Sequence, residues 1–166
     1  MGGVLRGDPS SGVTMGDRHG AEELGEATVR FYLDADLLGL AKLLVQVRYD
    51  VTYPGDPGGV LQRRRRPPCP VKDPAAPDTE WIPEVAARGW LIVTQDSHLQ
   101  DRRVQIAAVR EHGARMVAFT GRHAGGTFDQ LEAFITQWRR ILAVVDEPGP
   151  FIYTATRRTF HPFPLA

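Results

Sequence analysis

Two aspartates each follow a run of residues typical of a buried β-strand, and this arrangement constrains the fold more than any other feature. Residues 29–33 lead into Asp34, and residues 90–95 lead into Asp96. Open α/β folds bind their ligands beyond the carboxyl ends of the strands. Two carboxylates that leave strands at that edge can converge on one point although they are far apart in sequence. The pair therefore indicates a site for a divalent metal ion.

The rest of the chain alternates between strand and helix patterns. We expect strands at 29–34, 50–53, 90–95, 115–120 and 151–156, and helices at 37–48, 102–112 and 127–145. A further helix is expected from about residue 80 to 88, because Pro83 is tolerated only in a first turn. Such alternation, with short connections, predicts an α/β fold: a three-layer α/β/α sandwich with a mainly parallel central sheet.

The helix at 127–145 has the clearest pattern in the chain. Thr127 and Gln130 have the spacing of a capping box at its start. Apolar residues then recur every three or four positions, which predicts a face packed on the core. They are Phe128, Leu131, Ile135, Trp138, Leu142 and Val145.

Two segments lack such periodicity. Residues 1–27 are rich in Gly, Ser, Asp and Glu and are expected to form a disordered tail ahead of a single domain at 28–166. Residues 58–77 are expected to form an irregular loop that carries four consecutive arginines at 63–66. These arginines have two interpretations: they guide a phosphate backbone, or they are solvated linker charges.

Composition limits the function classes. With 42% hydrophobic and 24% charged residues, the chain of 166 residues resembles a soluble globular protein. No apolar run approaches the roughly 18 residues that span a bilayer. The single cysteine, Cys69, excludes an internal disulfide, so a cytoplasmic location is expected. The net charge is zero, so the chain lacks the excess of basic residues that is typical of a strong nucleic-acid binder. Any contact with nucleic acid must therefore be local.

Four acids are the main candidates for the site. Asp78, at a helix start, is expected to join Asp34 and Asp96 as a catalytic residue and metal ligand, with Asp36 assisting. Clustered carboxylates repel one another unless a cation offsets their charge, and Mg²⁺ or Mn²⁺ prefers oxygen ligands. The structural alternatives are that Asp36 starts the first helix and that Asp78 is only an N-cap.

Three segments resemble the PIN-like domains of VapC-type toxins. They are the strand ending in Asp34-Ala35-Asp36, the segment Asp78-x-x-Trp81-Ile82-Pro83-Glu84-Val85, and Gly89-Trp90 through Thr94-x-Asp96. The resemblance implies the α/β/α sandwich and a Mg²⁺- or Mn²⁺-dependent ribonuclease. It also implies a toxin of a type II toxin–antitoxin pair, inhibited by a cognate antitoxin protein.

One position departs from that family pattern. Relatives often carry another acid two residues after the one matched by Asp96, and His98 stands there in this chain. The number of metals is therefore open, and Asp101 or Glu80 is the candidate replacement. Thr94 and Thr120, at strand ends, have two interpretations: they hydrogen-bond the acids or a phosphate, or they are ordinary strand threonines, which the enrichment of Thr in strands favours.

The expected reaction is hydrolysis of an RNA phosphodiester by metal-activated water. Arginines from 63–66, or Arg102 and Arg103, are expected to hold the RNA backbone.

A phosphoacceptor receiver domain is a weaker alternative, because neither Lys42 nor Lys72 follows a core strand. The other alternative is a catalytically inactive PIN-like fold that binds RNA or protein. An exposed edge at 151–163 or an amphipathic face leaves room for an antitoxin or a second subunit.

Overall fold

A central six-stranded sheet organises the molecule. The computed structural model describes residues 2–3, 23–121 and 125–166. The strands lie in the order β3 (Val51–Thr52), β2 (Phe31–Leu33), β6 (Leu91–Gln95), β7 (Arg115–Phe119), β8 (Phe151–Ala155) and β9 (Phe160–Phe163). Every neighbouring pair is parallel except β8 and β9. The predicted mainly parallel sheet is confirmed.

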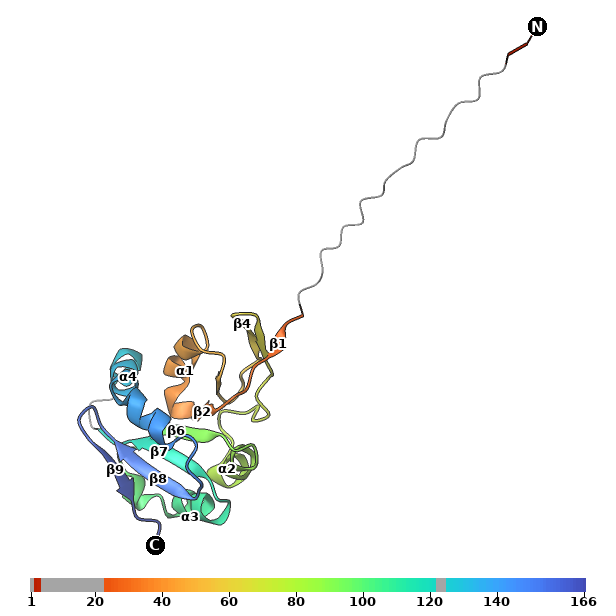
Figure 1. Cartoon of the computed structure of the whole chain (residues 1–166). Helices are drawn as coiled ribbons and strands as arrows, with labels where there is room; N and C mark the ends of the chain where they lie inside the picture. The colour runs from red at the N-terminus through yellow and green to blue at the C-terminus, as the bar shows by residue number, and fades with distance from the viewer. Residues whose placement is uncertain (1, 4–22, 122–124) are drawn as a thin grey trace.

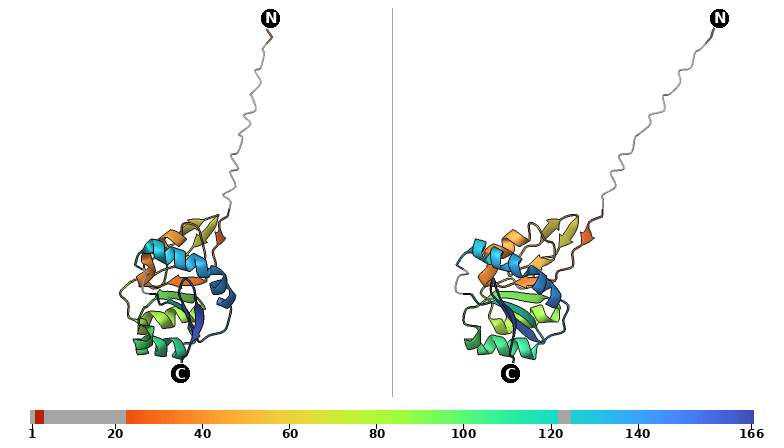
Figure 2. Two further views of the ribbon diagram at one scale, coloured as in Figure 1. Left: turned by 90° about the vertical axis from the view of Figure 1, so that its left-hand side faces the viewer. Right: turned by 60° about the vertical axis from the view of Figure 1, so that its left-hand side comes forward.

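Helices cover both faces of this sheet (Figures 1 and 2). Helices α1 (Leu38–Leu44) and α4 (Thr127–Val144) lie on one face, and α2 (Asp78–Ala87) and α3 (Arg103–Glu111) lie on the other. Short 3₁₀ turns, Ala35–Leu37 and Leu99–Asp101, follow β2 and β6. The three-layer α/β/α sandwich expected from the sequence is therefore present. Across the described part of the chain, no helix has the length and apolar character needed to cross a membrane.

Each central strand sends alternate side chains into two separate cores. Phe31 and Leu33 pack with α1 and α4, whereas Tyr32 between them packs with α2 and α3. The same division separates Val93 from its neighbour Ile92. A strand buried on both faces must be apolar at every position, which explains the continuous apolar runs in the sequence.

Helix α2 corrects one expected boundary. The helix begins at Asp78, so Pro83 lies inside it rather than in its first turn. Proline removes one backbone hydrogen bond from a helix and crowds the carbonyl four residues earlier. Trp81, Ile82 and Val85 are all buried on the same helix. Their packing outweighs the local cost of the proline, which sequence propensity alone overstated.

Helix α4 corrects the predicted core face. Its buried residues are Ala133, Phe134, Gln137, Ile141 and Val144. In contrast, Phe128 is 77% exposed, Ile135 is 61% exposed and Leu142 is also exposed. Of the other residues of the predicted stripe, Val145 is buried, and Leu131 and Trp138 are partly buried against the core, as expected. The stripe is thus turned by about one residue from the face that enters the core. An apolar row on this helix remains on the surface.

The predicted capping box at the start of α4 was also wrong. Gly126 is the N-cap, and Thr127 is already helical. The side-chain amide of Gln130 donates to Gln95 and to the Asp36 carbonyl rather than to the helix terminus. Tertiary contacts therefore use the glutamine that the spacing assigned to a cap.

A small second sheet corrects both segments that lacked periodicity. Strand β1 (Gly25–Glu26) lies inside the predicted tail and pairs with β5 (Arg64–Arg66), which pairs with β4 (Gly59–Leu61). The loop expected at 58–77 therefore begins with a hairpin. A buried ion pair between Arg66 and Asp56 anchors it. Residues 4–22 of the predicted tail lie outside the described residues.

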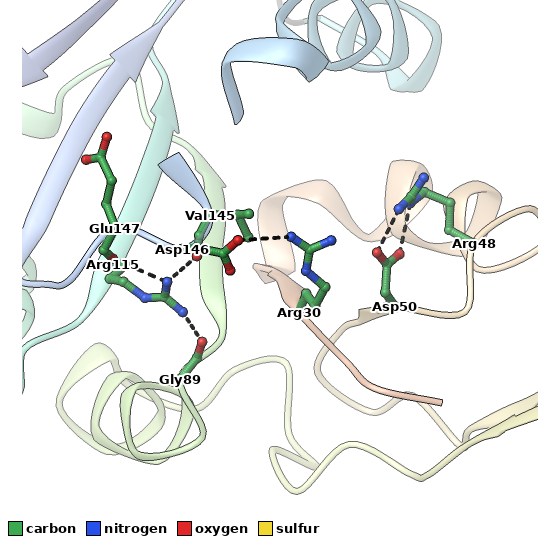
Figure 3. Close-up of polar contacts among 8 residues, drawn as sticks. All are labelled: Arg30, Arg48, Asp50, Gly89, Arg115, Val145, Asp146 and Glu147. Atoms are coloured by element: carbon green, nitrogen blue, oxygen red, sulfur yellow. Dashed lines mark hydrogen bonds and ion pairs between the residues drawn. The ribbon is translucent and has the colours of Figure 1, made fainter. Parts of the chain in front are cut away.

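Arginine side chains make stabilising polar contacts at the amino edge of the main sheet (Figure 3). Arg115, at the start of β7, donates to the carbonyls of Gly89, Val145 and Glu147. These carbonyls follow the C-terminal ends of α2 and α4, where a cation is favourable. Close by, Arg48 forms a two-pronged pair with Asp50 at 2.8 and 2.7 Å. The amino edge is thus held by polar contacts, which leaves the carboxyl edge for other uses.

Candidate active site

Asp34 stands at the carboxyl end of β2, as the sequence predicts. Its Oδ1 accepts the backbone N–H of Ala35 at 2.6 Å, and its Oδ2 accepts the Thr94 hydroxyl at 3.1 Å. Of the two interpretations of Thr94, the hydrogen bond to an acid is therefore the one present. Burial raises the pKa of Asp34 to about 6, and the charges of Asp36 and Asp78 add to that rise, while the two hydrogen bonds oppose it. The carboxyl group titrates closer to neutrality than an ordinary aspartate.

Asp96 directly follows β6, the strand that lies beside β2. Its side chain is only 9% exposed. Its Oδ1 accepts the backbone N–H of His98 at 2.8 Å. Its Oδ2 accepts Nε of Arg102 at 3.0 Å. In this structure His98 supports the acid through its backbone, and Arg102 offsets the charge of Asp96.

Asp36 and Asp78 reach the same region from two other elements. Asp36 lies in the 3₁₀ turn after β2, where Asp34 rather than Asp36 is the cap. Asp78 is the first residue of α2 and its Oδ1 accepts the Trp81 indole N–H at 3.0 Å, while Pro77 occupies the N-cap position. Asp78 is therefore not an N-cap, whereas Asp36 lies in the first turn of the helical segment that leads into α1, as its structural alternative expects.

The charges of neighbouring acids act on Asp34 and on Asp36. Burial, then Asp96, then Asp78 raise the pKa of Asp36, and Arg102 lowers it. Asp34 is influenced by Asp36 and Asp78 in the same way. Carboxylates that raise one another's pKa hold excess negative charge, which a cation would relieve. Glu80 and Asp101, the candidate replacements for the missing acid, are exposed.

The acids have the chemistry of a hard-cation site but are not drawn tightly together. Within the residues that the structure describes, no three His, Cys, Asp or Glu side chains form a group ready to hold a metal ion. Mg²⁺ usually needs only one or two carboxylates, because waters and substrate phosphates complete its octahedron. Asp34 and Asp96 follow adjacent parallel strands, so both lie at the carboxyl edge of the sheet.

The arginines expected to hold RNA differ in their surroundings, and two of them, Arg63 and Arg65, are exposed. Arg66 is buried against Asp56, so it serves the hairpin rather than a ligand. Arg64 lies over the Tyr49 ring, with its guanidinium carbon 5.0 Å from the ring centroid. Arg102 contacts Asp96 directly, and its neighbour Arg103 is exposed. Arg102 is thus the arginine best placed to meet a substrate at the acids.

Two cavities adjoin the acids, and sequence reasoning missed both. One of about 350 Å³ is lined by Gln95, Ser97, His98, Gln100 and Gly121. The other, of about 460 Å³, shares Gln95 and Gly121 with the first and extends between α4 and the sheet. Gln95, directly before Asp96, is a sequence signal that could have pointed to these cavities. A glutamine at a strand end does not predict a cavity, however, unless its partner on α4 is known.

Comparison with known proteins places this arrangement in a family. A family model described as "PIN like domain" matches residues 30–121, from the first strand of the main sheet to just beyond β7. The matched segment contains all four acids of the candidate site. Searches of curated proteins and of solved structures find no match. Since the model covers more than half of the sequence, this chain belongs to the PIN-like domain family, whose members are generally nucleases.

Proposed function

We propose that this protein is a Mg²⁺- or Mn²⁺-dependent endoribonuclease that hydrolyses RNA phosphodiester bonds. The observation that carries the proposal is the placement of Asp34 and Asp96 just beyond the carboxyl ends of the adjacent parallel strands β2 and β6, where hydrogen bonds hold each carboxylate. Membership of a family of nucleases agrees with it. Asp34 and Asp96 would hold the metal, with Asp78 and Asp36 completing the site directly or through water.

Each residue of the site has a role that follows from its contacts. Thr94 and the Ala35 N–H fix the carboxylate of Asp34 through one oxygen each. The His98 N–H fixes Asp96 in the same way, and Arg102 is free to exchange its carboxylate partner for a phosphate of the substrate because its side chain is 60% exposed. Fixed ligands and a guanidinium beside them are what in-line phosphoryl chemistry requires. The metal, when bound, activates water and stabilises the charge that develops on the phosphate.

A role as the toxin of a type II toxin–antitoxin pair is the finer part of the proposal. It requires a protein partner that covers the toxin, and exposed apolar rows are typical of such interfaces. On α4, Phe128, Ile135 and Leu142 form a row of this kind, with two turns between members. The same row is the candidate surface for a homodimer.

Cleavage of a mixed panel of structured and single-stranded RNAs tests the proposal. Purified protein is incubated with Mg²⁺, Mn²⁺ or EDTA, beside Asp96→Asn and the control Asp146→Asn. Asp146 is 93% exposed at the amino edge, so its charge is remote from the site. We expect cutting that needs metal, survives in the control and disappears in Asp96→Asn. Cutting that persists in EDTA or in Asp96→Asn would reject the assignment.

An inactive PIN-like fold that binds RNA or protein is the second candidate. It is favoured by the lack of a ready three-ligand group among the described residues and by Arg102 in contact with Asp96. Mn²⁺ binding discriminates the two functions. An inactive fold shows no Mn²⁺ affinity that depends on Asp34, whereas the nuclease loses such affinity in Asp34→Asn.

A further inference from the structure

The larger cavity beside the acids has the lining of a binding site for an aromatic, hydrogen-bonding ligand. We propose that it receives an unpaired nucleobase of the RNA strand, next to the phosphate presented to the acids. The inference rests on the proposed ribonuclease function and names a subsite that confers base selection.

The cavity is apolar over most of its wall. Leu37 and Leu40 line it from the first helical segment, Phe119 and Ala155 from the sheet, and Ala133 from α4. Its volume of about 460 Å³ lies within the range of pockets that enclose small organic ligands. A flat, weakly hydrated ring gains from such a wall, as unstacked RNA bases do in protein pockets. An inorganic ion would not.

Two carboxamides are among the polar groups of the cavity, whose lining also includes Asp129 and Thr156. The Gln130 amide donates to Gln95 Oε1 at 2.7 Å and, more weakly, to the Asp36 carbonyl at 3.4 Å. Among the residues described, no group donates to the Gln130 Oε1 atom. That oxygen is an acceptor for an exocyclic amine or ring N–H of a base, the groups that glutamine recognises in nucleic acids.

The same contacts place the cavity against the candidate active site. Gln95 precedes Asp96 in the chain, and Gln130 touches the backbone of Asp36. A ligand in this cavity therefore lies beside two of the four acids. The smaller polar cavity next to Asp96 shares Gln95 and Gly121 with it, so the two form adjoining subsites along one edge.

Two arginines add positive charge to the lining of the cavity. Arg157 and Arg158, which line it, are exposed. Arg157 pairs with Asp129 at 3.2 Å and with Glu132 at 3.3 Å, so a phosphate would compete with two carboxylates for it. Arg158 is the better candidate for a backbone phosphate. The cavity thus offers an apolar wall, an amide oxygen that accepts hydrogen bonds and a cation. This combination matches a nucleotide rather than an apolar metabolite.

Titration with single nucleotides tests the subsite without any cleavage. The full ¹⁵N-labelled chain is followed by NMR in EDTA, with each of the four nucleoside 5′-monophosphates and with ribose 5-phosphate. We expect at least one nucleotide to shift the Gln130 side-chain amide and the Ala155 backbone, and ribose 5-phosphate to leave both unchanged. Filling the cavity with Ala133→Leu should raise the dissociation constant about tenfold, in line with the loss of one base contact.

Two further variants complete the design. Gln130→Ala should weaken binding without adding volume, which guards against a fold defect in Ala133→Leu. Gln46→Ala is the matched control, because Gln46 is an exposed glutamine whose amide contacts only the Lys42 carbonyl among the bonds described. The inference is overturned if no nucleotide shifts these signals, if ribose 5-phosphate shifts them equally, or if both cavity variants bind as the wild type does. Nucleotide binding without RNA cleavage would reject the nuclease alone, and cleavage without nucleotide binding would reject the subsite alone.

Discussion

At the scale of single residues, Asp34 carries the most information about the site. It is buried at a strand end, and its two hydrogen bonds do not offset the cost of keeping its charge away from water. Such a carboxylate lowers the stability of the fold but provides a negative charge at the site. Active sites commonly show this trade, and it yields a prediction about the metal-free protein.

Asp34→Asn should stabilise the metal-free fold near pH 7 and remove part of its pH dependence. The pKa of Asp34 rises from 3.8 to about 6 on folding, so the folded protein binds this proton more tightly than the unfolded chain does. Stability is therefore lost as pH rises from about 4 to about 6 and stays lower above that range. The shift corresponds to about 2–3 kcal/mol, which the amide should regain. Urea unfolding at pH 4, 5, 6 and 7 measures it, and equal stability of the two proteins at pH 7 would contradict it.

Arg102→Gln should strengthen divalent-metal binding. The guanidinium of Arg102 occupies Asp96 Oδ2 and repels a cation that approaches it. Its removal frees the oxygen, so we expect Mn²⁺ to bind several-fold more tightly, as measured by calorimetry. Arg103→Gln is the control, since Arg103 is an exposed neighbour of equal charge. Unchanged or weaker affinity in Arg102→Gln would show that Asp96 is not a ligand.

At the scale of elements, the two edges of the sheet have different tasks. The carboxyl edge collects acids from β2, β6 and the start of α2, while the amino edge is closed by arginines that hold helix ends (Figure 3). The division follows from the parallel sheet, because all strand ends of one kind lie together. It separates residues whose loss affects activity from residues whose loss affects stability.

Arg115→Ala should destabilise the fold and leave the site intact. The substitution leaves the carbonyls of Gly89 and Val145 without their charged donor. Hydrogen bonds to charged groups contribute about 1.5–3 kcal/mol each, so the loss of two bonds should lower the free energy of unfolding by about 3–6 kcal/mol. Arg88→Ala removes only an exposed pair with Glu84 and should cost less than about 1 kcal/mol. Denaturant unfolding compares the two variants, and similar losses would refute the role given to Arg115.

At the scale of the whole molecule, the sequence was most informative where local pattern and tertiary burial agree. The central strands are buried on both faces, so their apolar runs marked them correctly and fixed the position of Asp34 and Asp96. The surface row on α4 has the same spacing as a core face, and only the packing of Phe134 and Ile141 distinguishes them. The hairpin at 59–66 depends on the pairing of Arg66 with Asp56, which no local pattern reveals.

The residues of the site divide in the same way. Some are placed by their own strand, and others by contacts between elements that are distant in the sequence. Strand-end acids could be predicted from sequence because their placement follows from the strand itself. The bond of Arg102 to Asp96 and the contact of Gln130 with Gln95 depend on how helices meet the sheet. For this reason the acids were foreseen, whereas the cavity between α4 and the sheet was not.

A crystal of the protein soaked in Mn²⁺ would reveal whether the acids bind metal, because anomalous scattering locates the ion without reference to activity. We expect one peak at the carboxyl edge, within about 2.0–2.5 Å of carboxylate oxygens of Asp34 and Asp96, with Arg102 displaced from Asp96. The peak should be absent from a soaked crystal of Asp34→Asn. A Mn²⁺ peak elsewhere, or none in crystals of the wild-type protein, would contradict the assignment of this edge as a metal-dependent active site.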